Sequence, residues 1–153
     1  MNELKKQLKE LESKIPMREL ISPEVSKSNI GWHIEHTLLT IDAIIHELKK
    51  SDPMNYKWSL RLPRLIVFTI NKIPRGRAKS PEVVVPKIYD EITLNKHLED
   101  VKLKIEELEN ISSDKYFDHP VFGNLKSGKT IKFIKIHTNH HLEIINDILK
   151  SKT

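Results

Sequence analysis

A repeated four-and-three spacing of apolar residues is the feature that most restricts the fold of this chain. Leu4, Leu8, Leu11 and Ile15 carry it at the start, with Lys and Glu between them. Because an α-helix turns once every 3.6 residues, this spacing places the apolar side chains along one face. The pattern recurs three more times along the chain, so it predicts several long amphipathic helices that pack on one another.

Turn and capping residues set the limits of these helices. The predicted helices span residues 2–15, about 30–50, about 60–73, 94–108 and about 129–150. Ser28 or Asn29 can cap the second of them, and Thr93 is predicted to cap the fourth. The third contains LIVFTI and is predicted to be a buried helix rather than a buried strand. The segment FDHPVFGNLKSG is predicted to be a short loop.

These elements favour an all-α fold, an antiparallel bundle of four principal helices with one shorter helix. The 153 residues are enough for one domain, spanning 1–153. Only four glycines occur in the chain, which argues against a turn-rich β sandwich or barrel. The segment 74–89 holds three prolines and is predicted to be a long loop, and loops of this length inside a domain are often functional.

The composition excludes several classes of site and location. No apolar stretch approaches the roughly 20 residues that a membrane span needs, and the charged start of the chain lacks an apolar signal segment. We therefore expect a soluble, cytoplasmic protein. The absence of cysteine rules out disulfides, thiolate metal sites and cysteine nucleophiles, and leaves His, Asp and Glu as candidate ligands.

The net charge of +5 is concentrated in one region. Between residues 57 and 79 the chain has seven basic residues and no acidic one: Lys57, Arg61, Arg64, Lys72, Arg75, Arg77 and Lys79. Such a patch could bind nucleic acid or a membrane surface. However, Trp58 and Phe68 are predicted to lie in the core, which leaves no exposed aromatic side chain among these cations. We therefore expect neither a nucleic-acid partner nor a membrane partner.

The segment IHTNHH brings three histidines close together near the C-terminus. On the last predicted helix His137 and His141 lie one turn apart in the middle of the apolar face, and His140 lies at its edge. Two imidazoles buried side by side need partners for their nitrogens, and a metal ion would satisfy both rings. Such a site needs a third ligand from another helix, and periodicity alone leaves His33 and His36 as alternatives.

The other titratable residues near these segments are predicted to have ordinary structural roles. His46 and His97 lie on mostly polar helix stretches and are predicted to be solvated. His119 is predicted to anchor its loop by a hydrogen bond. Glu35 and Glu143 are adjacent in sequence to candidate ligands but fall on polar faces, so neither is assigned as a catalytic base.

The segments GWHIEHTLL and HTNHHLEII resemble the DinB/YfiT-like superfamily of small helical metalloproteins. The resemblance implies metal ligands at His36, His137 and His141, with His140 as a non-ligating neighbour. The stretch HPVFGNLKSGKTIKFIKIHTNHH is similar to an uncharacterised branch of that superfamily. The chain has Leu142-Glu143-Ile144 where many members have Arg-Gly-Gln.

The resemblance also implies a four-helix bundle of up-down-down-up order, with a short extra N-terminal helix. It implies a divalent metal ion, and a site of three imidazoles favours Zn or Ni. It also implies a transferase or isomerase that uses a low-molecular-weight thiol. The partners would be a small-molecule thiol and an electrophile, and a homodimer is left open. Arg75 and Arg77 are candidate contacts for an anionic substrate. The alternative is a non-enzymatic bundle, metal-stabilised or metal-free, that acts through oligomer or protein contacts.

Overall fold

Five α-helices and one β-hairpin make up the protein in the computed structural model, which describes residues 1–76 and 80–152. The helices are α1 (Asn2–Lys14), α2 (Ile30–Lys50), α3 (Leu62–Ile70), α4 (Glu91–Glu107) and α5 (Ser127–Lys150). The strands β1 (Tyr116–His119) and β2 (Gly123–Lys126) pair antiparallel directly before α5. No described helix is both long and apolar enough to cross a membrane.

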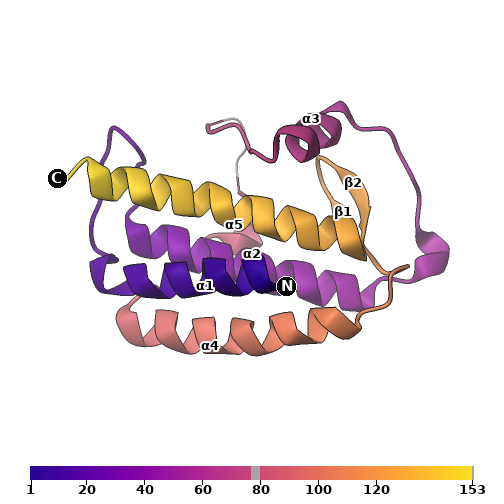
Figure 1. Ribbon diagram of the computed structural model, residues 1–153, viewed down its shortest axis with the longest axis horizontal. Helices are drawn as coiled ribbons and strands as arrows, with labels where there is room; N and C mark the ends of the chain where they lie inside the picture. The colour runs from indigo at the N-terminus through magenta and orange to yellow at the C-terminus, as the bar shows by residue number, and fades with distance from the viewer. Residues whose placement is uncertain (77–79, 153) are drawn as a thin grey trace.

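The four long helices α1, α2, α4 and α5 lie side by side and form the body of the molecule (Figure 1). Helices α1 and α5 run in one direction, and α2 and α4 run in the opposite direction. Their apolar stripes meet in one core, as the four-and-three spacing predicts. The expectation of a short extra helix at the N-terminus is wrong, since α1 belongs to the bundle and the short extra helix is α3.

The helix starts show which capping predictions hold. The side chain of Asn29 accepts a 2.9 Å hydrogen bond from the Trp32 backbone N–H at the start of α2. Asp90, rather than Thr93, caps α4. Its carboxylate accepts hydrogen bonds from both the backbone N–H and the hydroxyl of Thr93, at 3.0 and 2.8 Å. The negative charge of an Asp at the N-cap also interacts favourably with the positive end of the helix dipole, whereas an uncharged Thr has no such interaction.

A β-hairpin replaces the loop that was predicted before the last helix, so the fold is mostly helical rather than all-α. Gly123 has φ +66°, and a Cβ there would lie 2.8 Å from the Ser59 hydroxyl, so only glycine fits this turn. His119 anchors the turn by hydrogen bonds, as predicted, because its Nδ1 accepts from the backbone N–H groups of Val121 and Phe122. Burial lowers the pKa of His119 to about 4, which keeps the ring neutral as an acceptor.

Helix α3 is shorter than predicted and is mostly exposed. Only Val67 and Phe68 of its residues are buried, and the Phe68 ring packs edge-on against Phe122, with ring centroids 6.0 Å apart. The prediction of a core position holds for Phe68 and fails for Trp58, which is 68% exposed. The four long helices already fill the core, so α3 lies on the outside of the bundle (Figure 1).

A charged network between α2 and α4 contradicts two further expectations. His97 is not solvated. Its Nδ1 lies 2.9 Å from a carboxylate oxygen of Glu35, and its Nε2 lies 3.3 Å from one of Asp42. Glu35 is buried rather than exposed on a polar face, whereas His46 is exposed, as predicted. Burial alone would lower the pKa of His97, but hydrogen bonds and the charges of Asp42 and Glu35 outweigh it and raise the pKa to about 9.

This raised pKa predicts a pH-dependent contribution to stability. A His pKa near 9 in the folded state, against about 6.5 unfolded, contributes stability that is complete below pH 6.5 and is lost as the pH rises through 9. We expect His97→Gln to lower the free energy of unfolding by roughly 2–3 kcal/mol at pH 6, and by less at pH 10. Urea unfolding at both pH values checks this. His46→Gln is the control, and an equal loss at both pH values would contradict the ion pair.

Candidate metal centre

Three histidines from two helices converge between α2 and α5. His36 comes from α2, and His137 and His141 come from successive turns of α5. Each ring offers a nitrogen, and these three nitrogens lie within 4.8 Å of one another. The ring centroids are 4.6 Å apart for His137 and His141, and 4.8 Å apart for His36 and His141. The group could hold one metal ion.

A backbone carbonyl fixes the orientation of His36. Nδ1 of His36 lies 2.7 Å from the carbonyl oxygen of Val84, which can only accept a hydrogen bond, so Nδ1 carries the proton. In the neutral ring this leaves the lone pair on Nε2, the form that a metal ligand needs. The Trp32 ring stacks on His36 with ring centroids 4.9 Å apart and planes 9° apart, which limits rotation of the imidazole.

His33 supports His141 and does not itself join the group. The two Nδ1 atoms of His33 and His141 lie 3.0 Å apart, and Nε2 of His33 lies 2.9 Å from the Ser26 hydroxyl. If His141 donates to His33 and His33 donates to Ser26, the lone pair of His141 falls on Nε2. Of the two alternatives for the third member of the group, the structure therefore places His36 in the group, whereas His33 contacts the group only through His141.

The third ring, His137, has a polar atom without a partner. Its Nδ1 is buried and forms no hydrogen bond within the described chain, although the residue as a whole keeps some exposure. A buried imidazole nitrogen with no partner costs about 1–3 kcal/mol. Coordination of an ion through this nitrogen would offset that cost, so the residues present fit a metal ion.

The surroundings keep all three rings neutral. Burial, and secondly the neighbouring histidines, lower the pKa values of His137 and His141 well below their usual range. Burial also lowers the pKa of His36, although its hydrogen bond to Val84 opposes this. Neutral imidazoles are the form that binds metal ions, so near pH 7 no proton has to be displaced from these rings.

No carboxylate among the described residues joins the three histidines. Glu35 points to His97 on the other side of α2, and Glu143 accepts a hydrogen bond from Asn139. A purely imidazole set suits zinc, copper or nickel better than magnesium or calcium. Three protein ligands also leave coordination positions open, as in catalytic rather than structural zinc sites.

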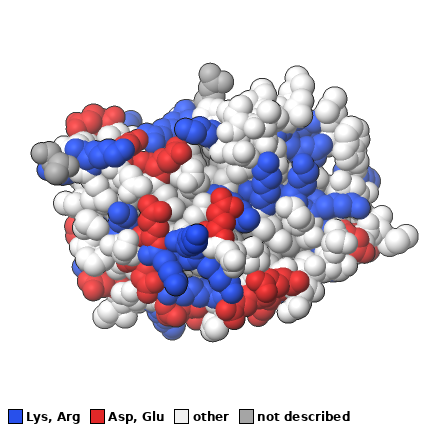
Figure 2. Space-filling view, in the orientation of Figure 1, with Lys and Arg blue, Asp and Glu red and all other residues white. Residues whose placement is uncertain are grey.

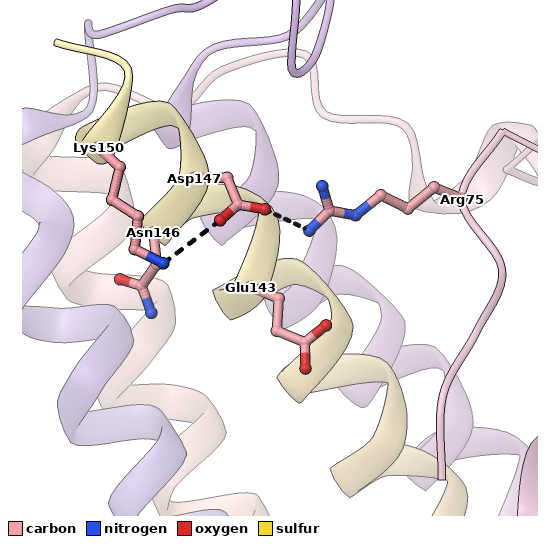
Figure 3. A pocket seen from close by; sticks show the side chains of 5 residues that line it. All are labelled: Arg75, Glu143, Asn146, Asp147 and Lys150. Carbon is pink, nitrogen blue, oxygen red and sulfur yellow. Dashed lines mark hydrogen bonds and ion pairs between the residues drawn. The ribbon is translucent and has the colours of Figure 1, made fainter. Parts of the chain in front are cut away.

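The predicted substrate contact Arg75 forms an ion pair with Asp147, and in addition to burial its charge is near enough to help lower the pKa values of His33 and His140. Its guanidinium donates a 2.8 Å hydrogen bond to Asp147, beside a surface cavity of about 290 Å³ that Glu143, Asn146 and Lys150 also line (Figure 3). Arg77, the other predicted contact, lies outside the described residues. The 74–89 segment contacts the three-histidine group directly through the Val84 carbonyl.

Two partners of the site carried no recognisable sequence signal. Val84 acts through its backbone carbonyl, which is the same for every residue type, and Ser26 lies in the loop before α2. The role of His33 could have been inferred, because it lies one helical turn before His36 and was already a candidate. What the sequence could not supply was the direction in which each ring points.

Comparisons of the chain with protein-family models, with curated proteins and with solved structures find no match. The resemblance to the DinB/YfiT-like superfamily therefore rests on the histidine segments themselves. Any activity assigned to the protein has to be argued from the geometry of this site.

The geometry predicts which histidines are needed for metal binding. We expect His36→Ala, His137→Ala and His141→Ala each to lose stoichiometric zinc or nickel, because two imidazoles hold a divalent ion much more weakly than three. His140→Ala should keep it, since His140 lies outside the group. Elemental analysis of protein purified without a metal-affinity tag measures this. Full metal retention by His137→Ala would contradict the assignment.

The contact of His33 with His141 predicts a smaller effect on metal affinity. His33→Ala should bind the ion with about 10–100-fold lower affinity, because loss of such an orienting partner loosens the ligand ring. Competition with a chromophoric chelator gives the dissociation constant, and His46→Ala serves as the control. An affinity equal to that of the wild type would show that His33 does not orient His141.

Proposed function

We propose that the protein is a metal-dependent enzyme of the DinB type. In this proposal His36, His137 and His141 hold one divalent ion, zinc or nickel, and the enzyme is a transferase or isomerase that uses a low-molecular-weight thiol. The observation that carries the proposal is the group of three neutral imidazoles that no fourth ligand among the described residues completes. The helix directions in Figure 1, which follow the order that the resemblance implies, support it.

When bound, the ion would supply a Lewis acid that lowers the pKa of a coordinated thiol or water. The chain's own residues hold and orient the ligands. The Val84 carbonyl, in the 74–89 segment, holds the His36 ring by a hydrogen bond. Ser26 orients the His141 ring indirectly, through His33. The chain has no cysteine, so the thiol has to come from solution.

The carboxylates nearest in sequence are not free to act as a base at this site. Glu35 is held by His97, and Glu143 is hydrogen-bonded to Asn139 on the surface of α5. An enzyme without a side-chain base next to its ligands needs its nucleophile activated in another way. Coordination of a thiol, like that of water, does this without a protein base, so the site is compatible with a thiol nucleophile.

One observation favours the alternative, a metal-stabilised bundle without enzymatic activity. The cavity beside Arg75, and the groove between α1 and α5 that Gln7 and Lys135 line, include none of the three histidines. An ion bound at a site without an open approach would stabilise the contact between α2 and α5. In that case a small thiol would not reach the ion.

Cobalt substitution separates the two functions. We expect the cobalt(II) protein to develop thiolate-to-cobalt charge-transfer absorption when a small thiol is added, because an open position lets the sulfur coordinate. Titration followed by absorption spectroscopy measures this, and His137→Ala under the same conditions is the control. A cobalt spectrum that thiols leave unchanged would contradict the thiol-dependent function and favour the stabilised bundle.

A further inference from the structure

Helix α3 and the segment before it expose a set of large apolar side chains, which we call the α3 surface. Its members are Trp58, Leu60, Leu62, Leu65, Ile66 and Ile70, each between 53% and 68% exposed. Val67 and Phe68 are the only buried residues of the helix, and hydrogen bonds from Arg64 to the Phe122 carbonyl and from Lys132 to the Phe68 carbonyl also hold it to the bundle. Apolar patches of this kind, when rimmed by polar groups, mark contacts with another protein or with a membrane.

Cations without acidic partners lie beside the α3 surface. Six of them form no ion pair with a carboxylate in the described part of the chain: Lys57, Arg61, Arg64, Lys126, Lys129 and Lys132. The ammonium group of Lys129 lies 5.5 Å from the centre of the Phe68 ring, so the cations of α5 adjoin α3. In Figure 2 a white, uncharged area over α3 at the upper right lies next to a group of Lys and Arg side chains.

We propose that the α3 surface docks the protein onto an anionic lipid bilayer. The exposed aliphatic side chains would enter the boundary between headgroups and acyl chains, and the cations would contact lipid phosphates. Trp58 suits the same depth, because its ring is apolar and its indole N–H remains polar. The association would be peripheral, since no described helix can span a membrane.

The charges favour lipid over other partners. A twofold contact between copies of the chain through this surface would set the cations of one copy against those of the other. Nucleic acid would satisfy the cations but would leave Leu62, Leu65 and Ile66 facing polar backbone. An anionic bilayer supplies both acyl chains and phosphate groups. The sequence-based expectation of no membrane partner depended on a buried Trp58, and the structure exposes that residue.

Co-sedimentation of the full-length protein with vesicles tests the proposal. We expect binding at low salt to vesicles of 70% phosphatidylcholine and 30% phosphatidylglycerol, and about tenfold weaker binding or none to phosphatidylcholine alone. The double variant Leu65→Gln/Ile66→Gln should bind the anionic vesicles about tenfold more weakly or worse. Ile92→Gln/Leu103→Gln, at two positions on α4 that are more exposed still, is the control and should bind as the wild type does.

Two charge-reversal variants test which cations contribute to vesicle binding. Lys57→Glu/Arg61→Glu should weaken vesicle binding about tenfold or more, whereas Lys6→Glu/Lys9→Glu on α1 changes the net charge equally and should have little effect. Thermal melting establishes that each variant is folded. Lack of binding by the wild type at low salt would overturn the proposal. So would equal weakening by both charge pairs, or a solution dimer that Leu65→Gln/Ile66→Gln dissociates.

Discussion

The candidate site depends on the packing of the first turns of α2 against the middle of α5. That contact brings His36 to His137 and His141, which are 101 and 105 residues further along the chain. The start of α2 is buried on nearly all sides, and Gly31 lets it approach Tyr89 and Arg18 closely, since a Cβ there would lie 3.0 and 3.1 Å from their side chains. Small errors in this packing would separate the three rings.

Two connecting segments then determine which nitrogen of each ring is available. The carbonyl of Val84, from the long connection between α2 and α4, binds His36, and Ser26, from the loop before α2, binds His33. The helices determine where the histidine rings lie, and these two segments determine how the rings are oriented. This arrangement gives a structural reason for the length of that connection. It joins two parallel helices, so it has to return along the bundle, and on its way it passes the three-histidine group.

The sequence predicted the parts of the structure that periodicity controls. The apolar stripes located the four long helices, and the placement of His137 and His141 on an apolar face indicated the site. Periodicity did not distinguish a buried helix from an exposed apolar one, so α3 and Trp58 were placed wrongly. It also missed the hairpin, whose strands are only four residues each, and the pairing of His97 with Glu35, which depends on the neighbouring helix.

X-ray absorption spectroscopy of the zinc- or nickel-loaded protein measures the ligand set directly. We expect three imidazole nitrogens at about 2.0–2.1 Å for zinc, with the multiple-scattering pattern of histidine rings, and at least one further light-atom ligand from solvent. Addition of a thiol should replace that solvent ligand with a sulfur at about 2.3 Å. A first shell completed by a fourth protein side chain, or one with fewer than three imidazoles, would contradict the open three-histidine centre.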